Sequence, residues 1–258
     1  MAIVRLHHRE AGEGTRPLVL LHGLFGSSAN WLGIARVLAP DWRVVIPDLR
    51  NHGRSFHDPD VSYPALAGDV RALLYALGLE RAVLVGHSMG GKTAMWLALT
   101  APDRVERLVV VDSAPVSYAS GVAGLLQGLA TLDLAVLPDR AAVDAALAAA
   151  APDARLRNFL LQNLVRQHGA WCWRMNVPAL LAGIDAITGW PEPPAGARYL
   201  GPSLFLHGGE SGYVQPAHEP AIRALFPYAR FRSVPGAGHW VYADRPAEFL
   251  AALRAFLA

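Results

Sequence analysis

Short apolar runs alternate with amphipathic stretches along most of the chain. Runs rich in valine, leucine and isoleucine are typical of strands that are buried on both faces of a parallel sheet. The predicted strands are residues 17–23, 42–48, 82–85, 107–112, 203–207 and 230–234. Apolar residues recur at helical spacing at residues 30–39, 63–79, 216–226 and 246–257. The alternation predicts an α/β fold, with a mostly parallel central sheet flanked by helices.

The alternation stops between residues 116 and 198, where the sequence predicts no apolar strand. Alanine- and leucine-rich stretches at 140–150 and 154–166 predict helices instead. A segment of about 80 residues is near the lower size limit for an independent domain. We therefore expect one core domain of residues 1–115 and 199–258. The insertion 116–198 is expected to form a helical lid that shares this core; a separate second domain is the alternative.

Composition and charge exclude several classes of protein. Apolar residues make up 53% of the chain and charged residues 17%, which is ample for a buried core and argues against disorder. The net charge is only +2 and the basic residues are scattered, so no nucleic-acid partner is expected. Cys172 is the single cysteine, which slightly favours a reducing compartment. With no signal sequence or apolar membrane span apparent, we expect a cytoplasmic location.

Residues 86–90 read Gly-His-Ser-Met-Gly and fit the pattern G-x-S-x-G. A predicted strand precedes this motif and a good helix opening follows it, which is the setting that a serine nucleophile elbow requires. The flanking glycines let the strand and the helix approach closely. We interpret Ser88 as a nucleophile; the alternative is a glycine-rich turn with an incidental serine. The position of its partners decides between the two.

A serine hydroxyl needs a base, an acid that orients the base, and donors for the oxyanion. His239 is the predicted base, because it lies in a glycine-rich loop between a strand and the last predicted helix. His22, His87 and His207 are expected to be structural or to line the substrate pocket. No cluster of histidine, cysteine and acidic residues shows metal-ligand spacing, so no metal is expected.

The acid that orients the histidine is expected at the edge of the sheet where the strands end. Asp112 closes the apolar strand 107–112 and would lie at the carboxyl edge of a parallel sheet. Glu210 follows the next strand along the chain and is the first alternative; Asp185 is a weaker one. We favour Asp112.

The expected oxyanion donors are backbone N–H groups. One belongs to Met89, directly after the nucleophile, and the other to the turn after the first central strand, where Leu24 is preferred and Phe25 is close behind. The apolar side chains around them predict a substrate pocket that includes Phe25 and Trp240. Trp171, Trp173 and Trp190 are further aromatic candidates for the pocket, with ordinary core packing as the alternative for each.

Four sequence blocks resemble a known family: residues 21–28, 48–55, 86–92 and 238–240. They are similar in kind and order to the α/β-hydrolase superfamily. Within it they resemble the small esterase group that includes α/β-hydrolase domain-containing protein 11 and bacterial esterases. The resemblance implies an α/β-hydrolase fold with the lid inserted after the sixth strand. Position 211 holds serine where many members carry the acid, which fits an acid relocated to Asp112.

The resemblance also implies a function. It indicates a serine esterase or thioesterase that cleaves short- to medium-chain acyl esters through an acyl-enzyme, without a cofactor. The expected partner is a small-molecule ester or thioester. A lactonase, a C–C bond hydrolase and a cofactor-free perhydrolase on the same triad remain alternatives, and a non-catalytic ligand receptor on this fold is a more distant one.

Overall fold

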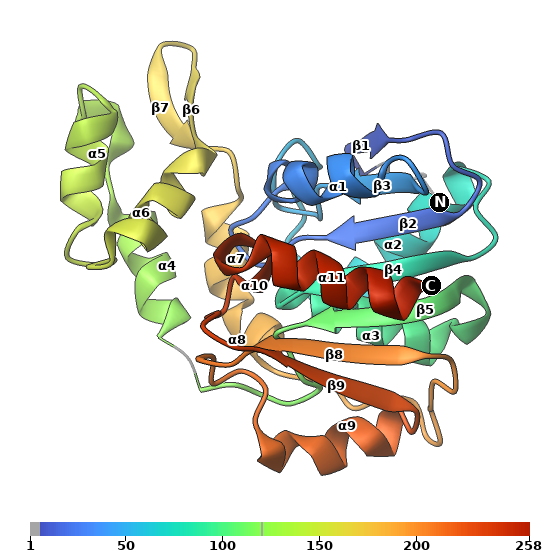
Figure 1. Ribbon diagram of the computed structural model, residues 1–258. Helices are drawn as coiled ribbons and strands as arrows, with labels where there is room; N and C mark the ends of the chain where they lie inside the picture. Colours follow the sequence, from blue (N-terminus) through green and yellow to red (C-terminus); the bar gives the residue numbers. More distant parts are fainter. Residues whose placement is uncertain (1–5, 120) are drawn as a thin grey trace.

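The computed structural model describes residues 6–119 and 121–258, within which seven strands form one sheet (Figure 1). The strand order is β1-β3-β2-β4-β5-β8-β9. All neighbouring pairs are parallel except β1 and β3, which are antiparallel. The strands are β1 (His8–Ala11), β2 (Pro17–Leu21), β3 (Arg43–Pro47), β4 (Ala82–His87), β5 (Val105–Val111), β8 (Ser203–Gly208) and β9 (Ala229–Val234). The predicted α/β-hydrolase architecture of a mostly parallel sheet flanked by helices is therefore confirmed.

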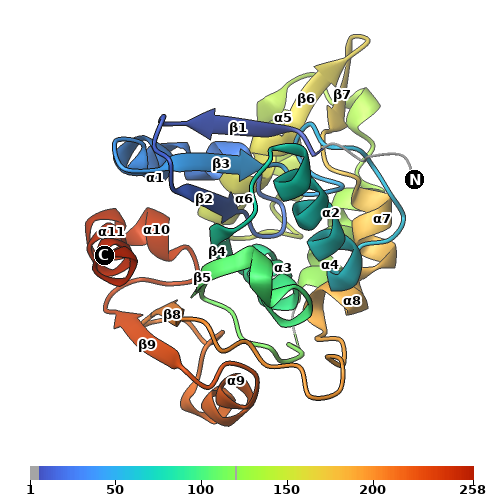
Figure 2. The same cartoon turned by 90° about the vertical axis from the view of Figure 1, so that its right-hand side faces the viewer.

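Helices cover both faces of the sheet (Figure 2). They are α1 (Leu32–Leu38), α2 (Tyr63–Ala76), α3 (Met89–Thr100), α9 (Glu219–Leu225), α10 (Val241–Asp244) and α11 (Pro246–Leu257). Side chains alternate along β2, so Leu18 and Leu20 pack with α1 and α11, whereas Val19 and Leu21 pack with α2 and α3. This alternation explains the continuous apolar run, because both faces of each central strand are buried.

Residues 116–198 lie beyond the carboxyl ends of the strands and join the core (Figure 1). Their helices are α4 (Val122–Thr131), α5 (Arg140–Leu147), α6 (Ala154–Leu160), α7 (Val177–Ala182) and α8 (Ile184–Thr188). Leu126, Leu160 and Leu180 from this segment belong to the same apolar cluster as α2 and α3. Short 3-10 helices lie at Ser28–Trp31, Pro102–Arg104, Leu134–Val136, Leu161–Asn163 and Pro216–His218.

The segment 116–198 contains a hairpin of β6 (Leu164–Gln167) and β7 (Ala170–Trp173), although the sequence pattern predicts helices and no apolar strand there. Its turn residues His168 and Gly169 both have positive φ, which matches a tight hairpin turn, and its half-exposed strands lack the apolar run of a core strand.

The insertion follows β5, the fifth strand of the described chain, and not a sixth. The edge strand β1 was not predicted either, because three of its four residues, His-Arg-Glu-Ala, are polar and the strand is partly exposed. Over residues 6–119 and 121–258, no helix combines the length and apolar character needed to cross a membrane.

Candidate active site

Ser88 lies on the sharp turn between β4 and α3, in a strained backbone conformation with φ 52° and ψ −116°. Only very close packing of strand and helix permits this turn. A Cβ added to Gly86 would lie 2.2 Å from the carbonyl oxygen of Gly90, and one added to Gly90 would lie 2.5 Å from that of Leu21. The glycines at 86 and 90 are therefore required by backbone contact, and the strain is held by the surrounding core.

Asp112 and His239 meet across the sheet edge. Asp112 directly follows β5 and is fully buried, and its backbone φ is also positive, at 51°. His239 lies in the loop between β9 and α10. Its Nδ1 lies 2.6 Å from Asp112 Oδ2, so the ring donates its Nδ1 proton to the carboxylate. This bond fixes the tautomer and leaves Nε2 as an acceptor, which is the state that a general base needs.

Two further donors hold the Asp112 carboxylate. The Ser211 hydroxyl donates to Oδ2 over 2.5 Å, and the Gly208 N–H donates to Oδ1 over 3.2 Å. Position 211, where many related folds carry the acid, thus supplies a hydrogen bond to the Asp112 carboxylate. The alternatives Glu210 and Asp185 are both exposed on the surface.

The turn after β2 supplies a candidate oxyanion donor. The Phe25 N–H donates to His52 Nε2 over 3.2 Å and is therefore occupied, and Phe25 itself has a φ of 64°. Within residues 6–119 and 121–258, the N–H groups of Leu24 and Met89 have no hydrogen-bond partner. Both residues line the same cavity as Ser88. This arrangement favours Leu24 over Phe25.

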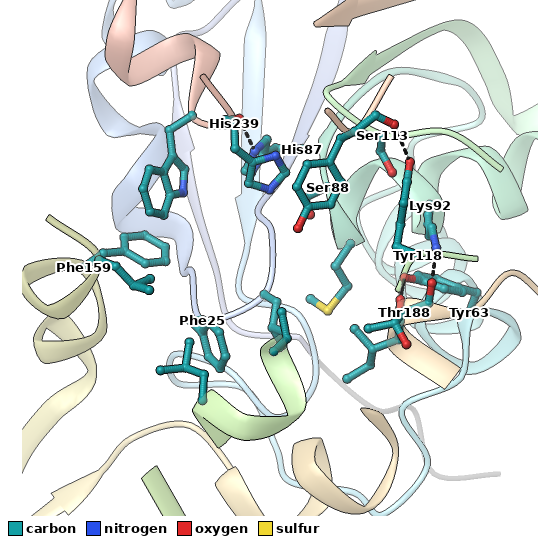
Figure 3. Close-up of a pocket in the computed structure, with 18 residues that line it drawn as sticks. Phe25, Tyr63, His87, Ser88, Lys92, Ser113, Tyr118, Phe159, Thr188 and His239 are labelled. Atoms are coloured by element: carbon teal, nitrogen blue, oxygen red, sulfur yellow. Dashed lines mark hydrogen bonds between the residues drawn. The ribbon is translucent and has the colours of Figure 1, made fainter. Parts of the chain in front are cut away.

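The cavity beside Ser88 has a volume of about 290 Å³. Its wall combines residues of the core with residues of the segment 116–198. The side chains are Leu24, Phe25, Tyr63, His87, Ser88, Met89, Lys92, Ser113, Tyr118, Val122, Leu125, Leu156, Phe159, Ile187, Thr188, Tyr213, His239 and Trp240. Figure 3 shows Ser88 between an aromatic side, with Phe25 and Phe159, and a more polar side, with Lys92 and Tyr118.

The structure separates the candidate histidines. His87 lines the cavity, and its Nε2–H donates to the backbone carbonyl of His239 over 2.9 Å. His22 and His207 lie outside the cavity wall, so the prediction that they line the pocket is wrong. The His22 ring is fully buried and forms hydrogen bonds with two backbone groups. Its Nδ1 pairs with the Gly23 carbonyl, and its Nε2 accepts from the Leu49 N–H. His207 is bound to the Gly208 carbonyl.

Sequence reasoning missed several cavity residues. The Tyr213 ring stacks on the His239 ring, with centroids 4.0 Å apart and an interplanar angle of 22°. Tyr118 and Phe159 come from the segment 116–198, where no motif marks them. Lys92 had a signal that could have been used, because it lies one helical turn after Ser88. Trp171, Trp173 and Trp190 do not line the cavity. Among the described residues, no group of three histidine, cysteine or acidic side chains could hold a metal ion.

Known proteins resemble this chain over nearly its whole length. The alpha/beta hydrolase fold family matches residues 16–246. The chain is 46% identical over 257 residues to the sn-1-specific diacylglycerol lipase ABHD11 of Mus musculus, which covers 96% of this chain and 83% of the relative. It is 36% identical over 258 residues to Esterase YbfF of Escherichia coli (strain K12), with 98% of each chain covered.

A solved structure of a marine microorganism esterase is also similar. Its TM-score is 0.94 at 35% identity, and the match covers 98% of this chain and 99% of that chain. Relatives named as a lipase or esterases thus share the fold, and they support ester hydrolysis as the activity of this chain. By the family match and these relatives, the chain belongs to the α/β-hydrolase family and is an esterase-like member of it.

Proposed function

We propose that the chain hydrolyses carboxylic esters and thioesters through a triad of Ser88, His239 and Asp112. The observation that carries the proposal is the 2.6 Å bond between Asp112 Oδ2 and His239 Nδ1, on an imidazole that lines the same cavity as Ser88. A buried carboxylate that orients the imidazole in this way is the arrangement that serine hydrolases need.

The reaction is a two-step acyl transfer. His239 Nε2 takes the proton of the Ser88 hydroxyl as its oxygen attacks the ester carbonyl carbon, and the resulting tetrahedral intermediate carries an oxyanion. The imidazolium then protonates the leaving alcohol or thiol as the bond to it breaks. In the second step His239 takes a proton from water, which attacks the acyl-enzyme and releases the acid. Asp112 stabilises the imidazolium in both steps.

The N–H groups of Leu24 and Met89 are the proposed oxyanion donors. Both are free of partners within the described residues, and Met89 opens helix α3, where the helix dipole favours negative charge. Two such donors are worth about 3 kcal/mol each in acyl transfer, because they are already oriented before charge develops. The cavity volume of about 290 Å³ supports a short- to medium-chain substrate.

The segment 116–198 is the proposed lid. Leu125, Leu156 and Phe159 from this segment line the cavity opposite the strand ends, so substrate binds between the lid and the core. A lid of this kind excludes water from the acyl-enzyme and bounds the acyl pocket.

The first prediction concerns the nucleophile. Ser88→Ala removes the attacking oxygen, and we expect hydrolysis of p-nitrophenyl acetate and butyrate to fall by at least about 1,000-fold in kcat. A fluorophosphonate probe is expected to label the wild type at Ser88 and to leave the variant unlabelled, as read by peptide mass spectrometry. Retained turnover in the variant would contradict the mechanism. A labelled protein that cleaves lactones or carbon–carbon bonds but no esters would favour the alternative reactions on the same triad.

A further inference from the structure

Lys92 is the one lysine of the chain, and it lines the cavity of Ser88. It follows Ser88 by four residues, about one turn of α3, so the two backbones are separated by about 6 Å along the helix axis. The residue is only 2% exposed, although lysine is among the residue types most rarely buried without an ionic partner. The mechanism proposed above does not use it.

The contacts of Lys92 leave its charge without a counter-ion. Nζ donates to the carbonyl of Thr188 over 2.9 Å and to that of Gly189 over 2.6 Å, and it lies 4.6 Å from the centroid of the Tyr118 ring. Within residues 6–119 and 121–258, no carboxylate forms an ion pair with it, and none lines the cavity. An ammonium group has three N–H donors, so one remains without a partner.

The neighbouring hydroxyls are already used. The Tyr118 hydroxyl donates to the Tyr213 carbonyl over 2.9 Å, and the Tyr63 hydroxyl donates to the Ile187 carbonyl over 2.5 Å. The Thr188 hydroxyl donates to a carbonyl of its own helix. The hydroxyls of Tyr118, Tyr63 and Thr188 are therefore occupied, whereas Lys92, on the same side of the cavity, retains one N–H donor (Figure 3).

A buried cation without a counter-ion is costly in free energy. Burial lowers the pKa of Lys92 to about 7, because the charged form loses its solvation by water. An anion that enters the cavity recovers part of the lost solvation, because opposite charges attract strongly where water is excluded. A neutral apolar group in the same place leaves the ammonium group uncompensated. The wall is thus selective for negative charge.

The position of His239 indicates which part of the substrate reaches Lys92. Because His239 protonates the leaving oxygen or sulfur, the leaving group must lie beside this imidazole. Figure 3 shows His239 and Lys92 on opposite sides of Ser88. The acyl chain therefore extends from Ser88 toward Lys92.

We propose that Lys92 binds a carboxylate at the far end of the acyl group, so that the substrates are monoesters or monothioesters of short dicarboxylic acids. The inference rests on the proposed serine-hydrolase function and names the substrate class of that site. Lys92 is a specificity-determining residue in this view: it takes no part in proton transfer, and it discriminates between acyl chains by charge.

The test compares two esters of nearly the same shape. Monomethyl glutarate carries the terminal carboxylate, and the methyl ester of glutaric acid monoamide carries a neutral amide in its place. Methanol release gives kcat/KM for each at neutral pH. We expect the wild type to prefer the charged ester by at least about tenfold, the effect of one charge-assisted hydrogen bond. Equal or lower kcat/KM for the charged ester overturns the proposal. O-Acetylglycolate instead carries its carboxylate on the leaving group. If the only preference for charge is for this ester over its neutral amide, the proposal is overturned too.

Variants then assign the preference to Lys92. Lys92→Met has a similar length without the charge, and we expect it to remove the tenfold preference, whereas Lys92→Arg should retain most of it. Thr93→Val is the matched control, because Thr93 is buried on the same helix and does not line the cavity. Its charged-to-neutral ratio should match the wild type. An equal loss for both esters in Lys92→Met would assign Lys92 only to holding the end of α8, and would overturn the proposal.

Failure of this inference is distinguishable from failure of the proposed function. Hydrolysis that persists in Ser88→Ala contradicts the function itself. Hydrolysis that requires Ser88 but shows no preference for the charged ester contradicts the role of Lys92 alone. If Lys92→Met does not fold, as judged by circular dichroism, the test uses the wild type alone. Glutarate and pentanoate are then compared as inhibitors of ester hydrolysis. Glutarate is expected to inhibit at least about tenfold more strongly, and equal inhibition overturns the proposal.

Discussion

Asp112 shows how one side chain can be specified by neighbours that are remote in sequence. Its carboxylate accepts from His239, Ser211 and Gly208, which lie about a hundred residues or more along the chain. Because each carboxylate oxygen has a donor, the group is fixed in space and its polar atoms are satisfied despite complete burial. With Asp112 as the proposed acid, the serine at position 211 can stand where related folds carry an acid.

Asp112→Asn is the second prediction. The amide cannot accept the Nδ1 proton in the same way, so the imidazole takes the wrong tautomer, and kcat for p-nitrophenyl butyrate should fall on the order of 1,000- to 10,000-fold. Glu210→Gln is the matched control, because Glu210 is exposed, and it should retain activity within about twofold. A loss of turnover confined to Glu210→Gln would assign the acid to position 210.

At the scale of elements, the turn between β4 and α3 depends on backbone contact. The strand and the helix cross so closely that a methyl group at position 86 would overlap the Gly90 carbonyl, at 2.2 Å. The cost cannot be relieved by a side-chain rotation, since the opposing atom belongs to the backbone. The backbone geometry of Ser88 is therefore a property of the packed β4–α3 unit.

The third prediction follows from that contact. Gly86→Ala should lower the free energy of unfolding by at least about 2 kcal/mol, measured by urea denaturation, and should reduce turnover because Ser88 moves. Gly124→Ala is the control, because Gly124 is exposed within α4 and an added Cβ meets nothing within 4 Å. That change should raise stability by about 0.5–1 kcal/mol. Equal stability of the two variants would contradict the argument.

At the scale of the whole molecule, three buried histidines couple folding to pH. Burial lowers the pKa of His22, brings that of His52 to about 3, and holds that of His87 well below its ordinary value. Below about pH 6.5, where the same rings in the unfolded chain bind protons, these rings are less protonated in the folded protein. The unfolded state thus gains protons as pH falls, and acid favours unfolding.

We therefore expect stability to decrease between pH 6.5 and 5. Each of the three groups contributes up to about 1.4 kcal/mol per pH unit, so the urea midpoint should fall clearly over this range. His8→Gln is the control variant, because His8 is only half-buried, on the edge strand, and is not one of these three groups. A midpoint that stays constant or rises from pH 6.5 to 5 would show that these histidines are charged in the folded protein.

The sequence by itself determined the elements whose signal is local. Six apolar strands and the order of strands and helices follow from hydrophobic periodicity, which depends on residues that are neighbours in the chain. The serine turn at 86–90 could be predicted equally well, because its glycines and its flanking strand and helix are contiguous in the sequence. The half-exposed strands β1, β6 and β7 were not, since edge strands and hairpins have no apolar run.

Only the tertiary structure decided which distant residues meet. It brought Asp112 against His239, turned His22 and His207 away from the cavity, and placed Lys92 in its wall. Such choices depend on how helices and strands stack, because the direction of a side chain at a strand end varies with backbone angles that a short motif does not encode. The periodic pattern specifies which residues are buried. The packing of the folded chain specifies which buried residues lie next to one another.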